Sequence, residues 1–187
     1  MPTFYEGDCI VQITNQKIDK ESFAQGFVYR EKILGSLKKS IWYCLFFVII
    51  AFIFAILTVK EYVLYKMAVK AIISVLSLIA AVYVTAVKSG VIKKSACNLY
   101  ESSELMHSPA TFKFYRDSFF IDTQYESFSG YWTDISAGVE NNERIMLASE
   151  WISRPIVIVK TEQNKELTDK LSQHLQKTLV YKYKKKG

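Results

Sequence analysis

The residues that most often carry out chemistry in proteins are few in this sequence, and they are not grouped. The two histidines, His107 and His174, have no partner pattern typical of a metal site. Cys9, Cys44 and Cys97 lie far apart and form no C-x-x-C pair, and their odd number indicates free thiols. The motifs of serine hydrolases, zinc proteases, P-loop enzymes and dinucleotide-binding folds do not occur.

The carboxylates fit structural roles better than catalytic ones. Asp117, Asp122 and Asp134 lie in or beside expected strands, where turn formation and bonds to local backbone explain Asp117 and Asp134. Glu101 and Glu104 are one helical turn apart, but no histidine or cysteine joins them in a ligand pattern. We therefore predict no catalytic residue, no cofactor and no metal site, and we do not expect an enzyme.

With catalysis set aside, recognition by surface side chains is the remaining chemistry. Aromatic residues recur through the second half of the sequence, and such residues are enriched where proteins bind one another. Core packing is the more common role of an aromatic residue in a small β domain. Five of them are candidates for an interface: Tyr115, Tyr125, Phe128, Tyr131 and Trp151.

The elements that must position these residues begin with two apolar runs, Ile41–Val59 and Met67–Val87, joined by the polar link Lys60–Lys66. Each run is about long enough to cross ~30 Å of hydrocarbon at ~1.5 Å per residue. The first run has no charge and the second has only Lys70, near its start. Buried helices of a soluble protein are the alternative, but two successive runs favour a transmembrane helical hairpin over 41–87.

Basic residues beside the runs predict the orientation of the hairpin. They are Lys38, Lys39, Lys88, Lys93 and Lys94. The link carries fewer lysines, so the positive-inside rule predicts that both termini are cytoplasmic. The net charge of +6 is explained by these flanks and a basic tail, which indicates contact with membrane lipid and no nucleic-acid binding. The absence of an acidic residue from both runs disfavours a carrier or pump.

Small residues could bring the two spans into contact. Ala51 and Ala55 in the first run, and Ser77 and Ala81 in the second, have four-residue spacing. In an antiparallel hairpin Ala51 and Ser77 would lie at similar depth. Because small residues are common in such helices, this contact stays undecided from the sequence.

The segments around the hairpin alternate between strand and helix patterns. Cys9–Thr14 reads as a strand too short to be stable alone, and we expect it to pair with the sheet formed after the hairpin. Asp19 can cap a helix that runs to Lys39, whose apolar face packs on the cytosolic domain or lies among lipid headgroups. After the hairpin, residues 88–109 read as a helical extension and a linker.

From Ala110 onward the pattern is that of antiparallel strands and one helix. The expected strands are Thr111–Tyr115, Phe119–Thr123, Ser129–Ile135, Arg144–Ala148 and Ile156–Val159, the last starting after Pro155. Ile156–Val159 is apolar throughout, so it is buried on both faces or close to the membrane. Thr161 or Asn164 caps a helix with a stripe of Leu167, Leu171 and Leu175. The tail Tyr181–Gly187 is too basic and short to fold alone, and it is either drawn to anionic lipid or solvated.

These elements predict an α+β fold: a transmembrane hairpin plus a cytosolic antiparallel sheet or barrel, pleckstrin-homology-like in its order, with a C-terminal helix. The predicted segments are the strand and amphipathic helix of 1–40, the hairpin 41–87, the linker 88–109 and the β-rich domain 110–187. Pairing of the first strand with the later sheet would make the hairpin an insertion within one domain.

Several segments resemble the YcxB-like family of bacterial membrane proteins. They are Thr111–Phe119, Tyr131–Ile135 and the strand ending at Val159 and Lys160 before the leucine-rich helix. The family usually has a proline followed directly by basic residues at its last strand, whereas here Pro155 precedes Ile156–Val159. The resemblance implies a bacterial inner-membrane protein with a two-span hairpin and a C-terminal β-rich domain, and it implies no activity.

The sequence thus predicts a non-enzymatic protein anchored in the inner (plasma) membrane. Its cytosolic β domain would bind a protein partner, or lipid headgroups, at the inner leaflet. An immunity protein against a membrane-active toxin is one specific form of this function. The alternative is a subunit of a membrane transporter or enzyme complex, and homo-oligomerisation stays open.

Overall fold

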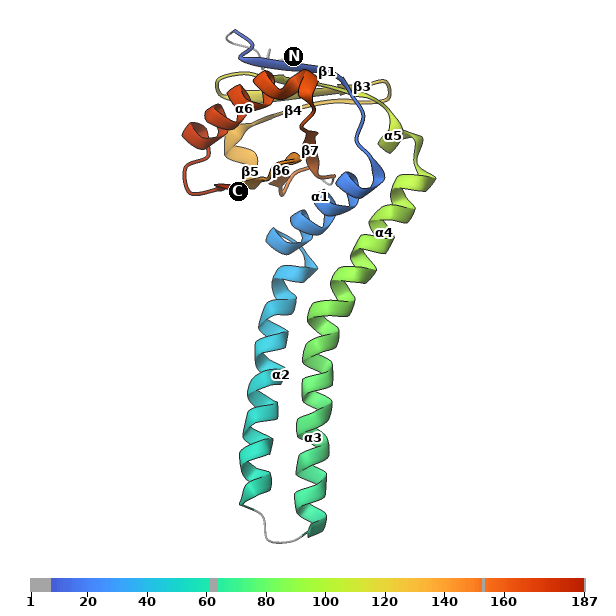
Figure 1. Cartoon of the computed structure of the whole chain (residues 1–187), viewed down its shortest axis with the longest axis vertical. Helices are drawn as coiled ribbons and strands as arrows, with labels where there is room; N and C mark the ends of the chain where they lie inside the picture. Colours follow the sequence, from blue (N-terminus) through green and yellow to red (C-terminus); the bar gives the residue numbers. More distant parts are fainter. Residues whose placement is uncertain (1–7, 61–63, 153, 187) are drawn as a thin grey trace. The chain divides into compact units, whose positions relative to one another are not determined.

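The computed structural model describes residues 8–60, 64–152 and 154–186 of the chain. These residues divide into two compact units (Figure 1). We call the described parts of Met1–Leu34 and Lys93–Gly187 the β unit, and Gly35–Ile92 the helical unit. The expected α+β class is confirmed. The β unit is therefore built from the segments that precede and follow the helical unit in the sequence.

Two long apolar helices make up most of the helical unit. Helix α2 spans Ser36–Val59 and α3 spans Leu64–Val82. A π-helical turn, Tyr83–Val87, continues α3 into α4 (Lys88–Ser102), whose residues from Lys93 belong to the β unit. By length and composition, α2 and α3 could each cross a membrane, and only 6% and 11% of their most apolar windows are buried.

Ala51, Ser77 and Ala81, whose contact the sequence left open, are buried, and Ala55 is exposed. The hydroxyl of Ser74, three residues before Ser77, donates to the carbonyl oxygen of Ala51 at 2.9 Å. Helix α3 begins at Leu64, three residues before the second apolar run at Met67.

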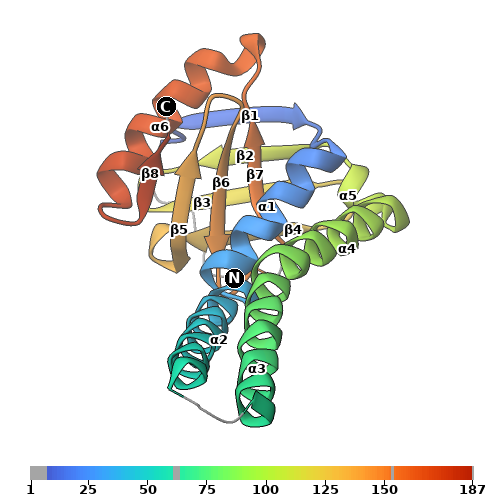
Figure 2. The ribbon, with the colours of Figure 1, turned by 60° about the horizontal axis from the view of Figure 1, so that its bottom comes forward.

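The described residues of the β unit form two four-stranded sheets. The first has the order β1-β2-β3-β4 and is antiparallel throughout: β1 (Val11–Gln16), β2 (Ala110–Phe114), β3 (Ser118–Thr123) and β4 (Ser127–Tyr131). The second has the order β7-β6-β5-β8: β5 (Ile135–Glu140), β6 (Arg144–Ser149), β7 (Ile156–Val159) and β8 (Tyr183–Lys185). Figure 2 shows the strands of the second sheet crossing the direction of the first.

The predicted pairing of the N-terminal strand is confirmed. β1 pairs antiparallel with β2, with Val11 opposite Phe114 and Ile13 opposite Phe112. The chain therefore leaves the first sheet at Gln16 and returns to it at Ala110, which is its pairing partner. Everything between them, including the helical unit, is an insertion between two neighbouring strands.

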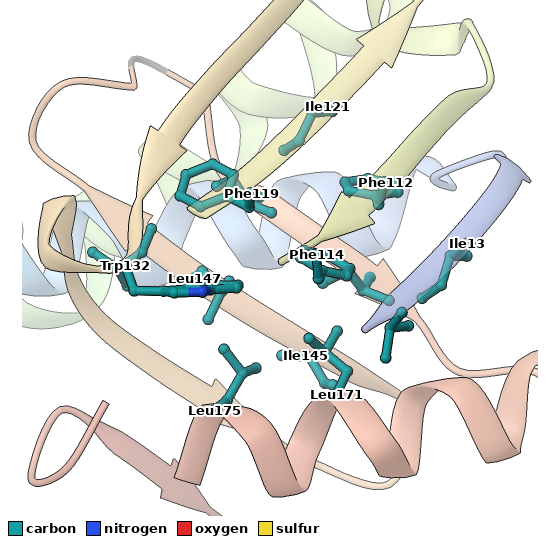
Figure 3. Packing of buried hydrophobic residues seen from close by; sticks show 14 of the residues in the cluster. Ile13, Phe112, Phe114, Phe119, Ile121, Trp132, Ile145, Leu147, Leu171 and Leu175 are labelled. Atoms are coloured by element: carbon teal, nitrogen blue, oxygen red, sulfur yellow. The ribbon is translucent and has the colours of Figure 1, made fainter. Parts of the chain in front are cut away.

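The core of the β unit lies between the two sheets. Alternation in β2 points Phe112 and Phe114 inward, where Trp132 stacks on Phe114 at a ring separation of 5.9 Å (Figure 3). Helix α6 (Lys165–Thr178) adds Leu171 and Leu175, both fully buried, so the predicted leucine stripe is confirmed. Of the two predicted caps, Asn164 occupies the N-cap position of α6 but makes no side-chain hydrogen bond to that helix. Its amide oxygen instead accepts the backbone N–H of Thr161 at 2.8 Å, at the start of the 3₁₀ turn Glu162–Asn164.

Helix α1 (Lys20–Ile33) covers the outer face of the second sheet. Asp19 caps it by accepting the backbone N–H of Ser22 at 2.8 Å, as predicted. Gly26 lies against Val157, where a β-carbon would approach the side chain to 2.4 Å. The packing interpretation is thus confirmed, and it explains why β7 is apolar on both faces. The helix ends at Ile33 rather than Lys39, because Gly35 separates it from α2.

One further prediction is wrong. The expected strand Ser129–Ile135 is two strands joined at a corner, where a 3₁₀ turn at Trp132–Asp134 leads from the first sheet to the second. Asp134 holds this corner by accepting the backbone N–H of Tyr131 at 2.9 Å. In the basic tail, Tyr183–Lys185 form β8, which pairs parallel with β5, while the lysine side chains of the tail are exposed. Residues 88–109 contain α4 and the short α5 (Glu104–His107).

Candidate functional site

The five aromatic candidates lie at two ends of β4. Phe128 and Trp151 line one hollow, and Tyr125 is in the adjacent turn between β3 and β4. Tyr131 ends β4 and pairs with Ser118, which follows the turn that begins at Tyr115. Phe128 and Tyr131 are three positions apart on β4, which is a rise of about 10 Å along the strand. The predicted interface residues therefore belong to two separate sites.

The first of these, which we call the Trp151 site, is a hollow of about 350 Å³ beside β4. The indole of Trp151 is 84% exposed at its rim. Arg154 lies over the ring of Phe128 with its guanidinium carbon 4.9 Å from the ring centre, and it forms an ion pair with Glu126 at 2.8 Å. Burial lowers the pKa of Arg154. Met106 and Ile152 complete the apolar wall of the Trp151 site.

The second site, which we call the Tyr131 site, is a hollow of about 330 Å³ between the corner after β4 and the end of α6. Tyr131 and Val180 line it and are 45% and 54% exposed. Tyr181, next in sequence, is 96% exposed and has a φ of 68°. This left-handed conformation is uncommon for a bulky residue, and it presents the phenol ring to solvent.

Tyr115 and Tyr125 have local partners. The backbone of Tyr115 shapes its turn, because its N–H donates to Ser118 and its carbonyl accepts the indole N–H of Trp132 at 3.0 Å. The Tyr125 hydroxyl donates to Glu104 at 3.3 Å, and its ring is 53% exposed. Only Phe128, Trp151 and Tyr131 of the five line the two hollows.

The largest cluster of polar groups that sequence reasoning missed surrounds Glu140 at the end of β5. This side chain is fully buried and accepts hydrogen bonds from Lys160 at 2.5 Å, Ser172 at 2.5 Å and Tyr183 at 2.7 Å. Burial alone would raise the pKa of Glu140, but these donors outweigh it and lower the pKa to about 2. Burial and the neighbouring Glu140 carboxylate raise the pKa of Tyr183.

The Glu140 cluster joins four elements and is built for structure. Glu140 ends β5, Lys160 follows β7, Ser172 lies on α6 and Tyr183 starts β8. Every donor points to the carboxylate, and neither Glu140 nor Ser172 is accessible to a substrate, at 0% and 3% exposed. The cluster therefore anchors the C-terminal strand, and with it the turn that carries Tyr181.

The charged residues flanking the spans have different surroundings. Lys38, Lys39 and Lys94 are exposed, Lys88 is half-buried, and Lys93 pairs with Glu21 at 2.6 Å. The Lys93 pair joins α1 to the part of α4 in the β unit, where Phe23 packs on Tyr100 with ring centres 5.7 Å apart. In residues 8–60, 64–152 and 154–186, no group of three or more metal-ligand side chains converges.

Comparisons with protein-family models, curated proteins and solved structures find no match to this chain. Its function is therefore inferred from the geometry of the two units and the two surface sites.

Sequence reasoning missed the Glu140 cluster and Tyr181 for different reasons. The partners of Glu140 are 20, 32 and 43 residues away in sequence, so no local spacing reveals them. The exposure of Tyr181 depends on a turn held by the N–H of Tyr183 bonding to the carbonyl of Leu179 at 3.0 Å. The one available signal was a pair of tyrosines, Tyr181 and Tyr183, within an otherwise basic tail.

Proposed function

We propose that this chain is a non-enzymatic anchored protein of the bacterial inner membrane, whose helical unit spans the bilayer and whose β unit binds a protein partner beside it. The observation that carries the proposal is the uncovered apolar surface of α2 and α3. Large apolar side chains along both helices are exposed, among them Phe46, Phe52, Ile72 and Ile79 at 57–67%. Each would gain about 1.5–3 kcal/mol on leaving water for an apolar surrounding.

The distribution of lysines supports a cytoplasmic β unit. Lys38 and Lys39 are exposed on the first turns of α2, and Lys94 is exposed shortly after the second span. Lys60 and Lys66, at the other end of the helices, are outnumbered by the flanking lysines. Under the positive-inside rule both connections from the spans to the β unit lie on the cytoplasmic side.

The strand order supports a pleckstrin-homology-like architecture for the β unit. Four antiparallel strands form one sheet, a corner leads into the second sheet, and α6 packs into the core after β7. In this arrangement the spans are inserted between β1 and β2. The YcxB-like relationship, with a two-span hairpin and a β-rich domain, is proposed on the same basis.

The Tyr131 site is the proposed surface for a protein partner. Tyr131, Val180 and Tyr181 give it exposed apolar and aromatic area around a hollow, which is the composition of binding hot spots. Asp117 and Lys182 add one charge of each sign to its lining. If the partner is a membrane-active toxin, the protein is an immunity protein.

Photo-crosslinking in native membranes tests the proposed function. A photoreactive phenylalanine analogue at position 181 should capture one protein in a fixed ratio to the chain. Tyr131→Ser in the same chain should abolish this product, whereas Tyr125→Ser, at the other end of β4, should leave it unchanged. A chain that inserts into membranes and yields no such product, or a product indifferent to Tyr131→Ser, would contradict the proposed partner site.

A further inference from the structure

The exposure of Trp151 is unusual for a side chain of its size. Tryptophan is generally well buried in folded domains, whereas this indole is 84% exposed beside an apolar hollow. The other described tryptophan of the β unit, Trp132, is 3% exposed in the core. A tryptophan that offers its ring to the surroundings and keeps an N–H donor suits the boundary between hydrocarbon and water.

Two polar contacts fix the position of the segment around Trp151. The guanidinium Nε of Arg30 donates to the carbonyl oxygen of Ile152 at 3.1 Å. On the other side, Arg154 pairs with Glu126 in the turn after β3. The segment that carries the exposed indole is therefore fixed by a polar contact on each side, and one of the two contacting residues, Arg30, lies in the last turn of α1.

That last turn is close in sequence to the start of the first span. Helix α1 ends at Ile33, and the span begins at Leu37, one residue into α2. Arg30 is seven residues before Leu37, and seven residues of fully extended chain cover at most about 25 Å. In a membrane that contains the span, the chain itself therefore keeps Arg30, and with it Ile152, on the side from which the span enters.

The charge that suits an anionic lipid surface lies along the chain leading into the span. Lys32 in the last turn of α1 is exposed, and Lys38 and Lys39 follow on the first turns of α2. Each basic residue near such a surface contributes about 1 kcal/mol of attraction. The Trp151 site itself carries no positive excess, because Glu126 pairs with Arg154 and Glu150 is exposed beside Trp151. A lipid surface also explains why the rim of the Trp151 site is apolar while Arg154 is tucked over Phe128.

We propose that the Trp151 site contacts the headgroup layer of the leaflet from which the first span enters, with the Trp151 indole placed at the boundary with the hydrocarbon. The inference rests on the proposed membrane anchorage. Trp151 then gives the β unit an attachment to the membrane besides its two chain connections. Because the Tyr131 site lies at the other end of β4, this attachment leaves it open to a protein.

Depth-dependent fluorescence quenching tests the contact. The chain contains three tryptophans, Trp42, Trp132 and Trp151, so two substitutions isolate the relevant ones. The full chain is reconstituted into vesicles of phosphatidylethanolamine and phosphatidylglycerol that carry a spin label at a shallow or a deep acyl position. Trp42→Phe leaves Trp151 as the exposed reporter, Trp151→Phe leaves Trp42 of the first span, and the double variant leaves the buried Trp132.

The expected result is loss of Trp151 emission with the shallow label, weaker loss with the deep label, and no loss in the double variant. Tyr181→Trp in the double variant is the matched control, because it places an exposed tryptophan at the Tyr131 site, where quenching should be absent. Quenching of Trp42 without quenching of Trp151 would overturn the lipid contact and leave the anchor standing. Absence of quenching from both would overturn the anchor and the contact together.

Protection of Trp151 only when a protein partner is present would also overturn the proposal. In that case the soluble quencher acrylamide should reach Trp151 in vesicles of the chain alone and lose access on addition of a membrane extract. Lipid contact instead predicts that vesicles alone reduce acrylamide quenching of Trp151 relative to detergent lacking phospholipid, with no further effect of the extract.

Discussion

Replacing Glu140 with glutamine should destabilise the β unit by about 3 kcal/mol at pH 7. The lowered pKa of Glu140, about 2 against an ordinary 4.5, corresponds to about 3 kcal/mol at about 1.4 kcal/mol per unit. Removing one partner of a buried ion pair generally costs about 3–5 kcal/mol, which agrees with this figure. Glutamine keeps the shape but leaves the Lys160 ammonium without its carboxylate.

The destabilisation should depend on pH in one direction. Because the folded pKa is depressed, the carboxylate contributes its full stabilisation above about pH 4.5 and loses it as the pH falls toward 2. The free energies of unfolding of the parent chain and the Glu140→Gln variant, measured against pH, should therefore differ at pH 7 and converge near pH 2. The difference in unfolding free energy stays constant from pH 7 to about pH 4.5 and shrinks between about pH 4.5 and pH 2.

Urea unfolding of the full chain in detergent measures the effect. With Trp42 and Trp151 replaced by phenylalanine, the emission of Trp132 reports on the core between the sheets. A loss of 3 kcal/mol should move the urea midpoint down by about 1–3 M for typical slopes. Glu150→Gln, at an exposed position, is the control and should change the free energy of unfolding by less than about 0.5 kcal/mol.

Equal midpoints for the Glu140→Gln variant and the parent at pH 7 would refute the reasoning. So would a separation that stays constant from pH 7 to pH 2, because it would show that the effect comes from shape rather than charge. Faster hydrogen exchange of the β8 amides in the variant is expected as well, since Tyr183 loses a charged acceptor.

Three other substitutions or deletions test the packing. Gly26→Ala should lower the free energy of unfolding by about 1–3 kcal/mol, because the added methyl group overpacks against Val157. Gly90→Ala is the control: its β-carbon would have nothing within 4 Å, so it should be neutral or stabilising. Urea midpoints measure both changes, and equal effects of the two substitutions would contradict the account. Ala51→Leu should separate α2 from α3, because the buried Ala51 site has no room for a larger side chain; unchanged cysteine cross-linking between the helices would contradict this. Deleting Met1–Asn15 should lower the thermal unfolding temperature of the β unit, because it removes the core side chains of β1; an unchanged temperature would show that β1 contributes nothing.

Local patterns in the sequence predicted much of the fold. Alternation in Phe112–Phe114, the capping position of Asp19 and the strand start after Pro155 each act within a few residues, so their signals survive without tertiary information. The sequence did not predict the break between α1 and α2 at Gly35 or the corner at Trp132–Asp134. Both interrupt an apolar pattern that continues through them, and only packing against other elements shows where the chain must turn.

The surface sites were less predictable than the fold. Aromatic residue type alone pointed to Phe128, Tyr131 and Trp151, but it could not divide them between two ends of one strand. The C-terminal tail reads as a solvated or lipid-bound segment because its lysines dominate the composition. Its order depends on the phenol of Tyr183 reaching Glu140, which is 43 residues away in sequence.

Cysteine labelling most directly tests the central claim that the chain spans the membrane twice with its β unit in the cytoplasm. In a chain whose three native cysteines are replaced, Lys60→Cys marks the end of α2 and Gln173→Cys marks the exposed face of α6. A membrane-impermeant maleimide should label the cysteine at position 60 in intact spheroplasts and the cysteine at position 173 only after lysis. Labelling of position 173 in intact spheroplasts, or protection of position 60 until lysis, would contradict the proposed membrane topology.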